Sequence, residues 1–139
     1  MTVEEKKQEL SRYRVSQAEE SLDEARFLLS GNKSARSVLN RVYYAMFYAV
    51  LALLVYEPYS SSKHSGVLSF FNRRFIKEHT FPEALGRPLN KAFELRQRGD
   101  YREYITLHYE QIEPFIGQAE AFLLAVKDYL RKAHKGVGL

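Results

Sequence analysis

The sequence contains no cysteine and no tryptophan, and it is sparing with glycine and proline, which number seven and four. Without cysteine, the chain can form no disulfide bond, no thiolate metal site and no cysteine nucleophile. The glycines are isolated or lie in the tail, which excludes a glycine-rich phosphate loop. The histidines lack the spacing of metal ligands, so we expect no metal and no other cofactor; they are His64, His79, His108 and His134.

Long apolar segments are also scarce, since only residues 42–56 form one. At about 1.5 Å per helical residue this run spans roughly 22 Å, which is short of a hydrocarbon core of about 30 Å. The N-terminus is charged from its fourth residue and does not resemble a signal peptide. The sequence therefore predicts a cytoplasmic protein without membrane contact.

The composition that is present fits one globular domain. The chain has 139 residues, of which 45% are hydrophobic and 27% charged, a balance typical of folded rather than disordered chains. Ten tyrosines and nine phenylalanines supply the aromatic content. The formal net charge of +4 favours anionic partners, although spare lysines on a solvated surface would give the same excess.

The apolar spacing is helical throughout and never alternates with period two. It predicts helices over residues 3–30, 35–56, 63–78, 88–98 and 110–131. Ser34 is the expected N-cap of the second helix. Pro88 is expected in the first turn of the fourth helix, which Gly99 would end. We expect an all-α, up-and-down helical bundle of four long helices plus a short one over residues 1–132. Residues 133–139 are expected to form a flexible basic and glycine-rich tail.

The second of these helices is apolar on nearly all sides, so it must be covered on all sides. Ala45, Ala49 and Ala52 form a seam of small residues that another helix could approach closely. The cover could come from the rest of the chain, from a second copy across a two-fold axis, or from both. We favour a homodimer.

Arginine and tyrosine are the residues that could carry chemistry. Arg41 and Tyr44 share one helix face. Further along, three arginines at a helix end are interleaved with aromatic residues, a pattern that suits a phosphate-bearing ligand. Alternatively, these arginines stabilise the helix dipole and pair with Asp100. The candidates in this segment are Arg96, Arg98, Asp100, Tyr101, Arg102, His108 and Tyr109.

Histidine can transfer protons near neutral pH, and a nearby arginine can stabilise charge that develops on phosphate. Arg102 and His108 could together cleave RNA without a metal, but on one continuous helix they would lie on different faces. The alternative for His108 is a packed, hydrogen-bonded side chain. His64 precedes a serine and a glycine at a predicted helix start, where capping is the simple interpretation.

Four segments together resemble the HEPN superfamily of nucleotide-binding domains, in particular its small stand-alone prokaryotic members. They are Arg41-Val-Tyr-Tyr-Ala-Met-Phe-Tyr, Lys63-His-Ser-Gly-Val, Leu95-Arg-Gln-Arg-Gly-Asp-Tyr and Ala119-Glu-Ala-Phe. The resemblance covers about residues 5 to 132. It implies a dimeric helical bundle, often encoded beside a minimal nucleotidyltransferase that acts as its antitoxin.

Toxin-like members of that superfamily are metal-independent ribonucleases with an Arg-x(4–6)-His motif. On this chain the motif has two placements: Arg96 reaches Tyr101, where tyrosine replaces histidine, and Arg102 reaches His108. The first fits the flanking pattern better, whereas the second keeps the proton-transfer group, because a phenol with a pKa near 10 is a poor base at neutral pH.

Three functions therefore stay open at this point. The first is a HEPN protein that binds RNA or a nucleotide as the toxin-like partner of a nucleotidyltransferase, with ribonuclease activity. The second is a non-catalytic dimeric protein-interaction module. The third is an enzyme for a small phosphorylated ligand, with a pocket lined by Arg41, Tyr44 and His64.

Overall fold

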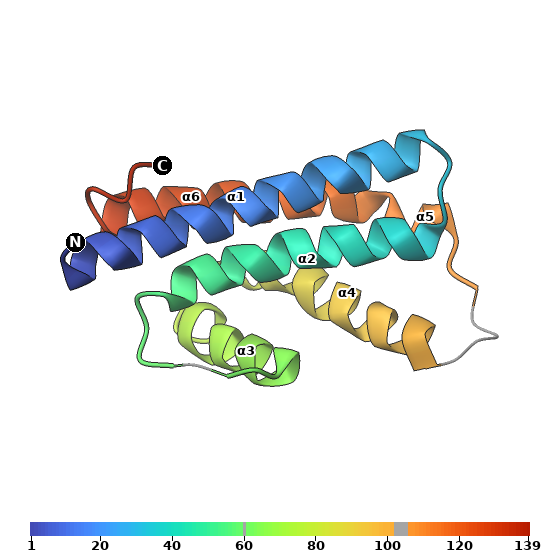
Figure 1. Ribbon diagram of the computed structural model, residues 1–139. Coiled ribbons are helices and arrows are strands. Elements are labelled where there is room, and N and C mark those ends of the chain that lie inside the picture. The colour runs from blue at the N-terminus through green and yellow to red at the C-terminus, as the bar shows by residue number, and fades with distance from the viewer. Residues whose placement is uncertain (60, 102–105) are drawn as a thin grey trace.

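A computed structural model describes residues 1–59, 61–101 and 106–139, and within them the chain is all-α with no strand. Figure 1 shows α2 in the middle, α1 and α6 along one side, and α3 and α4 along the other. The predicted all-α class is confirmed. The helices are α1 (Val3–Ser30), α2 (Ala35–Leu54), α3 (His64–Phe71), the π-helix η1 (Asn72–Ile76), α4 (Glu83–Tyr101), α5 (Tyr109–Ile112) and α6 (Pro114–Ala133).

The first two helices begin where their capping residues predict. The Thr2 hydroxyl accepts a hydrogen bond from the Glu5 backbone N–H at 3.1 Å, and the Glu5 carboxylate accepts from the Thr2 backbone in return. Ser34 caps α2 by accepting from the backbone N–H of Ser37 at 3.2 Å. Each side chain satisfies a donor that the first helical turn leaves free.

The predicted third and fourth helices need correction. The third is a short α-helix that passes into η1 and ends at Ile76, while the fourth is long and begins at Glu83. Pro82 rather than Pro88 marks its start, because the Pro82 carbonyl accepts the N–H of Leu85 at 3.0 Å. Pro88 lies inside α4, and Gly99 does not end it.

The other helix ends differ less from the prediction. α2 stops at Leu54, two residues before the expected end, and a turn leads from it to Pro58. The last predicted helix is split into α5 and α6, because Pro114 begins a new helix at a position where its missing N–H costs nothing. The number of long helices is four, as predicted: α1, α2, α4 and α6.

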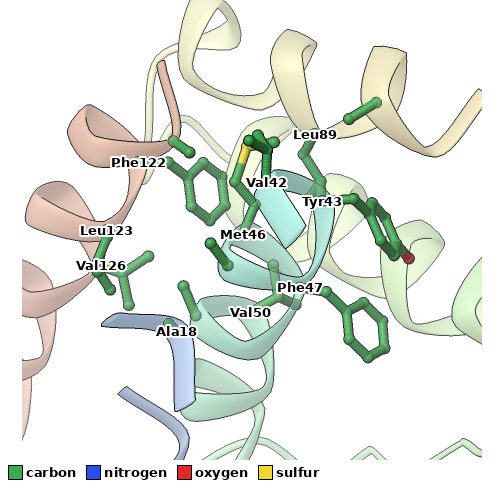
Figure 2. Close-up of a cluster of buried hydrophobic side chains, with 14 of the residues drawn as sticks. Ala18, Val42, Tyr43, Met46, Phe47, Val50, Leu89, Phe122, Leu123 and Val126 are labelled. Carbon is green, nitrogen blue, oxygen red and sulfur yellow. The ribbon is translucent and has the colours of Figure 1, made fainter. Parts of the chain in front are cut away.

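The core is centred on α2, of which thirteen residues are buried. Figure 2 shows α2 side chains such as Met46 packed among residues from α1, α4 and α6. Ala45, Ala49 and Ala52 are at most 1% exposed, and the hydroxyl of buried Ser11 in α1 donates to the Ala52 carbonyl at 3.0 Å. α1 therefore packs closely along this helix. Among the described helices, α2 alone is long and apolar enough to cross a membrane, but most of it is buried within the bundle.

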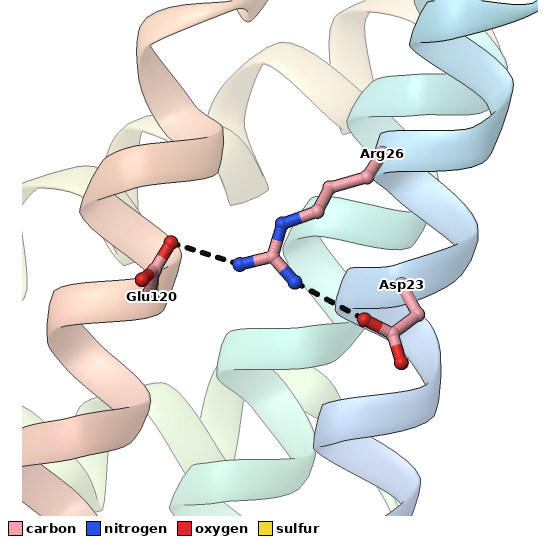
Figure 3. A network of polar contacts seen from close by, with 3 residues as sticks. All are labelled: Asp23, Arg26 and Glu120. Atoms are coloured by element: carbon pink, nitrogen blue, oxygen red, sulfur yellow. Dashed lines mark hydrogen bonds and ion pairs between the residues drawn. The ribbon is translucent and has the colours of Figure 1, made fainter.

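Polar contacts join α1 to α6 at the surface. Arg26 contacts Asp23 in its own helix at 3.1 Å and Glu120 of α6 at 2.8 Å (Figure 3). Exposed pairs of this kind contribute at most about 1 kcal/mol, so they orient the helices rather than hold them. Beyond α6, Val137 is buried, and its carbonyl accepts from Arg12 of α1 at 2.8 Å.

Candidate functional site

Arg96 contacts two adjacent aromatic rings from a neighbouring helix. It lies on the last part of α4, and its guanidinium carbon is 5.2 Å from the ring centroid of Tyr43 and 5.1 Å from that of Tyr44, both on α2. One terminal nitrogen donates to the Tyr44 hydroxyl at 3.3 Å. Cation–π contacts of this kind orient the planar guanidinium and keep its charge next to apolar surface.

One hydrogen-bond donor of the Arg96 guanidinium is not used by any described residue. Its Nε atom is buried and has no hydrogen-bond partner among the described residues. A buried charged donor without a partner is costly. Arg96 forms no ion pair with any described residue, so an anionic ligand could pair with its charge.

His64 stands beside this arginine at the start of α3. Its Nδ1 atom lies 2.9 Å from the hydroxyl of Tyr43, and its ring stacks on Phe47 with centroids 4.1 Å apart. Burial first, and then the charge of Arg96, lowers the pKa of His64 below its ordinary value. Burial raises the pKa of the Tyr43 hydroxyl, so the phenol stays protonated at neutral pH.

These groups open onto a pocket of about 380 Å³ between the start of α3 and the end of α4. The described residues that line it include two cations and no carboxylate. A positive, partly aromatic pocket without acidic groups suits an anion that carries a ring, such as a nucleotide. The lining residues are Tyr44, Lys63, His64, Ser65, Phe93, Arg96 and Gln97.

Arg41 lies near this pocket but not in it. Its guanidinium carbon is 5.1 Å from the ring centroid of Tyr44, which confirms that the two share a helix face. It also contacts Glu24 of α1 at 3.5 Å and Asn40 at 3.0 Å. Arg41 therefore covers the outer side of Tyr44 while its charge is partly paired.

Of the other predicted site residues, Arg98, His108 and Tyr109 do not line the pocket. Arg98 is half exposed and forms an ion pair with Glu94. His108 is exposed, and its backbone N–H donates to the Gln111 side chain at 2.9 Å, while the Tyr109 hydroxyl donates to the Lys33 carbonyl. Arg102 and the side chains of Asp100 and Tyr101 lie outside the described part of the chain.

Sequence reasoning missed several members of the site. Tyr43 and Phe47 lie one helical turn apart on α2 and place the His64 ring. Lys63 and Phe93 could have been found from their neighbours, since one adjoins His64 and the other lies about one turn before Arg96. Among the residues that the structure describes, no cluster of three or more histidine, aspartate or glutamate side chains could hold a metal ion.

The lowered pKa of His64 makes stability depend on pH. The unfolded chain binds more protons at this histidine than the folded protein does. The stabilising contribution of neutral His64 is therefore complete above the unfolded pKa of about 6.5, and the free energy of unfolding should decrease as the pH falls below it. Burial lowers the pKa of His134 as well, so His64→Gln should weaken the dependence without removing it. Urea unfolding between about pH 7.5 and 5.5 measures this.

The control for this experiment is His79→Asn, which changes an exposed histidine whose backbone φ of 62° asparagine tolerates. The control should follow the wild-type pH profile. Equal pH dependence in His64→Gln and wild type would contradict a neutral His64 in the folded protein.

A helical bundle with an arginine, tyrosine and histidine pocket between two of its helices is consistent with the HEPN class. The HEPN domain model matches residues 11–129, and the chain therefore belongs to the HEPN family. It is 43% identical over 121 residues to a UPF0332 protein of Thermotoga maritima, a match that covers 87% of this chain and 91% of the relative.

Two proteins of Methanocaldococcus jannaschii, both named "Putative toxin", are also similar to the chain. One is 36% identical over 116 residues, which covers 84% of this chain and 78% of the relative. The other is 35% identical over 115 residues, which covers 83% and 84%. The names place toxin-like proteins among the relatives of this chain.

Proposed function

We propose that this chain is a toxin-like HEPN protein that binds RNA or a nucleotide in the pocket around Arg96. The observation that supports this most is the guanidinium itself, which contacts two tyrosine rings and whose buried Nε has no partner among the described residues. Arginine binds phosphate in a bidentate fork, and hydrogen bonds to charged groups contribute about 1.5–3 kcal/mol each. The pocket therefore offers a prepared phosphate site.

The other lining residues complete this proposal. Lys63 is exposed at the rim and adds a second positive charge, while Phe93 and Tyr44 give an aromatic wall on which a base can pack. Neutral His64 can donate or accept a hydrogen bond at its second ring nitrogen. Phosphate and base would thus be bound by adjacent groups in one pocket.

For cleavage, two histidines could transfer the proton. His108 has the motif spacing from Arg102, and His64 has the pocket geometry and a pKa lowered by burial. Cleavage through the RNA 2′-hydroxyl needs a proton acceptor and charge stabilisation but no metal. We propose that the motif pair cleaves and that the pocket around Arg96 holds the RNA.

Incubation with total RNA in EDTA tests this function. The wild type should cut RNA, and Arg102→Ala/His108→Ala should not, while both should bind it with an affinity that falls as salt rises. Loss of cutting in His64→Gln alone would assign the proton transfer to the pocket instead. RNA binding by neither protein, at any salt concentration, would contradict the proposed function.

We also propose a cytoplasmic homodimer whose partner is a nucleotidyltransferase that acts as antitoxin. The toxin names among the relatives support this context. Large apolar side chains at the surface support a protein interface, since Phe27 on α1 is 73% exposed and Leu124 on α6 is 58% exposed. A second copy or the partner would bury them.

A further inference from the structure

A second pocket, of about 460 Å³, lies between η1 and α4. Its basic residues are Lys77 and Arg87, with His79 beside them. The polar pair Asn72 and Asn90 lines the same pocket, and each amide donates to the other across the two helices, at 2.9 and 3.1 Å. The pocket is polar, positive and separate from the one around Arg96.

Both pockets lie between the α3–η1 segment and α4, and we call the surface that includes them the groove. The α3–η1 segment and α4 run antiparallel, because the start of α3 faces the end of α4 while η1 faces the beginning of α4. On α4 the lining residues Gly86, Asn90, Phe93 and Gln97 repeat at helical spacing and so share one face. The twelve residues from Gly86 to Gln97 span roughly 16 Å. The groove is therefore long enough for about five stacked nucleotides at 3.4 Å each.

Charge is distributed unevenly between this groove and the opposite side of the bundle. Four cations line its two pockets, and the one carboxylate among the described lining residues, Glu83, lies 3.8 Å from Arg87. A third pocket, on α1, is lined by four carboxylates, of which Glu19, Asp23 and Glu24 pair with Lys127, Arg26 and Arg41. The excess of cations in the two groove pockets would favour binding of a polyanion there. The cations are Lys63, Lys77, Arg87 and Arg96, and the α1 carboxylates are Glu19, Glu20, Asp23 and Glu24.

Close packing fixes the second pocket. A Cβ atom at Gly86 would lie 3.0 Å from the Ile76 side chain, so glycine allows η1 to approach α4. Directly after η1, His79 takes a φ of 62°, a left-handed conformation that reverses the chain. Lys77 thus lies on a constrained turn, and Arg87 lies on α4.

We propose that single-stranded RNA lies along this groove and that Lys77 and Arg87 form a second phosphate subsite, beyond the one at Arg96. This proposal rests on the proposed function, which it extends from a single pocket to a track. The amide donors of Asn72 and Asn90 are used within the protein, so this pair joins the two helices between the ends of the groove. The aromatic wall at Phe93 would bind a base at one end.

Binding of oligoribonucleotides of two lengths tests the subsite. Fluorescence anisotropy with labelled strands of about three and about ten nucleotides would compare the wild type with Lys77→Gln/Arg87→Gln. The variant should bind the longer strand about tenfold more weakly and the shorter one unchanged. Its slope of log affinity against log salt should fall by about 1.4, since each lost phosphate contact removes roughly 0.7.

The matched control is Lys6→Gln/Lys7→Gln, which removes the same charge from an exposed part of α1. If the groove variant and the control bind the longer strand equally and with equal salt slopes, the second subsite is wrong. Arg96→Gln distinguishes failure of the second subsite from failure of the proposed function. If Arg96→Gln loses RNA binding while the Lys77/Arg87 variant keeps it, RNA binds in the pocket at Arg96 and not at the second subsite. Binding of neither strand by the wild type would overturn both proposals.

Discussion

Arg96→Gln is expected to weaken RNA binding by roughly 10- to 150-fold, which corresponds to the loss of about 1.5–3 kcal/mol for hydrogen bonds from a charged group. Glutamine keeps a polar side chain next to Tyr43 and Tyr44 but loses the positive charge and the buried Nε donor. Anisotropy titration of a labelled RNA strand measures the change. Thermal unfolding followed by circular dichroism checks that the variant is folded.

Arg96→Lys and a distant lysine variant make this result specific. Lysine keeps the charge but lacks the planar fork that binds phosphate in a bidentate manner, so its affinity should be intermediate. Lys132→Gln removes a charge from an exposed pair with Asp128 on α6 and should bind as the wild type does. Wild-type affinity in Arg96→Gln would show that RNA does not bind in this pocket.

Phe71→Ala is expected to lower the free energy of unfolding by about 3–5 kcal/mol, the range for deletion of a buried aromatic side chain. Phe71 is fully buried and packs on three other phenylalanines, with ring centroids 5.8 Å from Phe75, 6.3 Å from Phe81 and 5.5 Å from Phe122. It joins α3 to α6, so its loss leaves a cavity where these elements meet. Urea unfolding gives the free energy.

Val3→Ala is the control for core packing. Val3 is the first residue of α1 and is 71% exposed, and its truncation should change the free energy of unfolding by at most about 0.5 kcal/mol. Because Phe71 anchors α3, Phe71→Ala should also weaken RNA binding at the groove. If Phe71→Ala lowers the free energy of unfolding by less than about 1 kcal/mol, the aromatic cluster is not packed as tightly as the structure shows.

The fold was predictable where a local signal decided it. Thr2, Ser34 and Gly31 mark helix ends through hydrogen bonds to their own neighbours, and α1 has the predicted bounds. The start predicted from Pro88 was wrong, because α4 begins after Pro82, six residues earlier. The π-helix was not predicted, because the apolar spacing over residues 63–78 fits an ordinary α-helix and carries no signal for a wider turn.

The site was predictable only in part, for a similar reason. Arg96, Tyr44 and His64 were candidates because their residue types suit phosphate and proton transfer. That they share a pocket depends on how α3 packs against α2 and α4, which spacing along one helix cannot give. The pairing of Arg102 with His108 stays a prediction, because Arg102 lies outside the described residues.

The π-helix η1 has a consequence for the evolution of the groove. A π-turn holds about one residue more than an α-turn, so the extra residue is taken up by the wider turn. Deletion of one residue within Asn72–Ile76 would restore α-helical winding and leave Lys77 in nearly the same direction relative to His64. The alignment of the two ends of the groove therefore tolerates the loss of one residue at this point. A related chain with a shorter segment here could keep both the pocket at Arg96 and the position of Lys77.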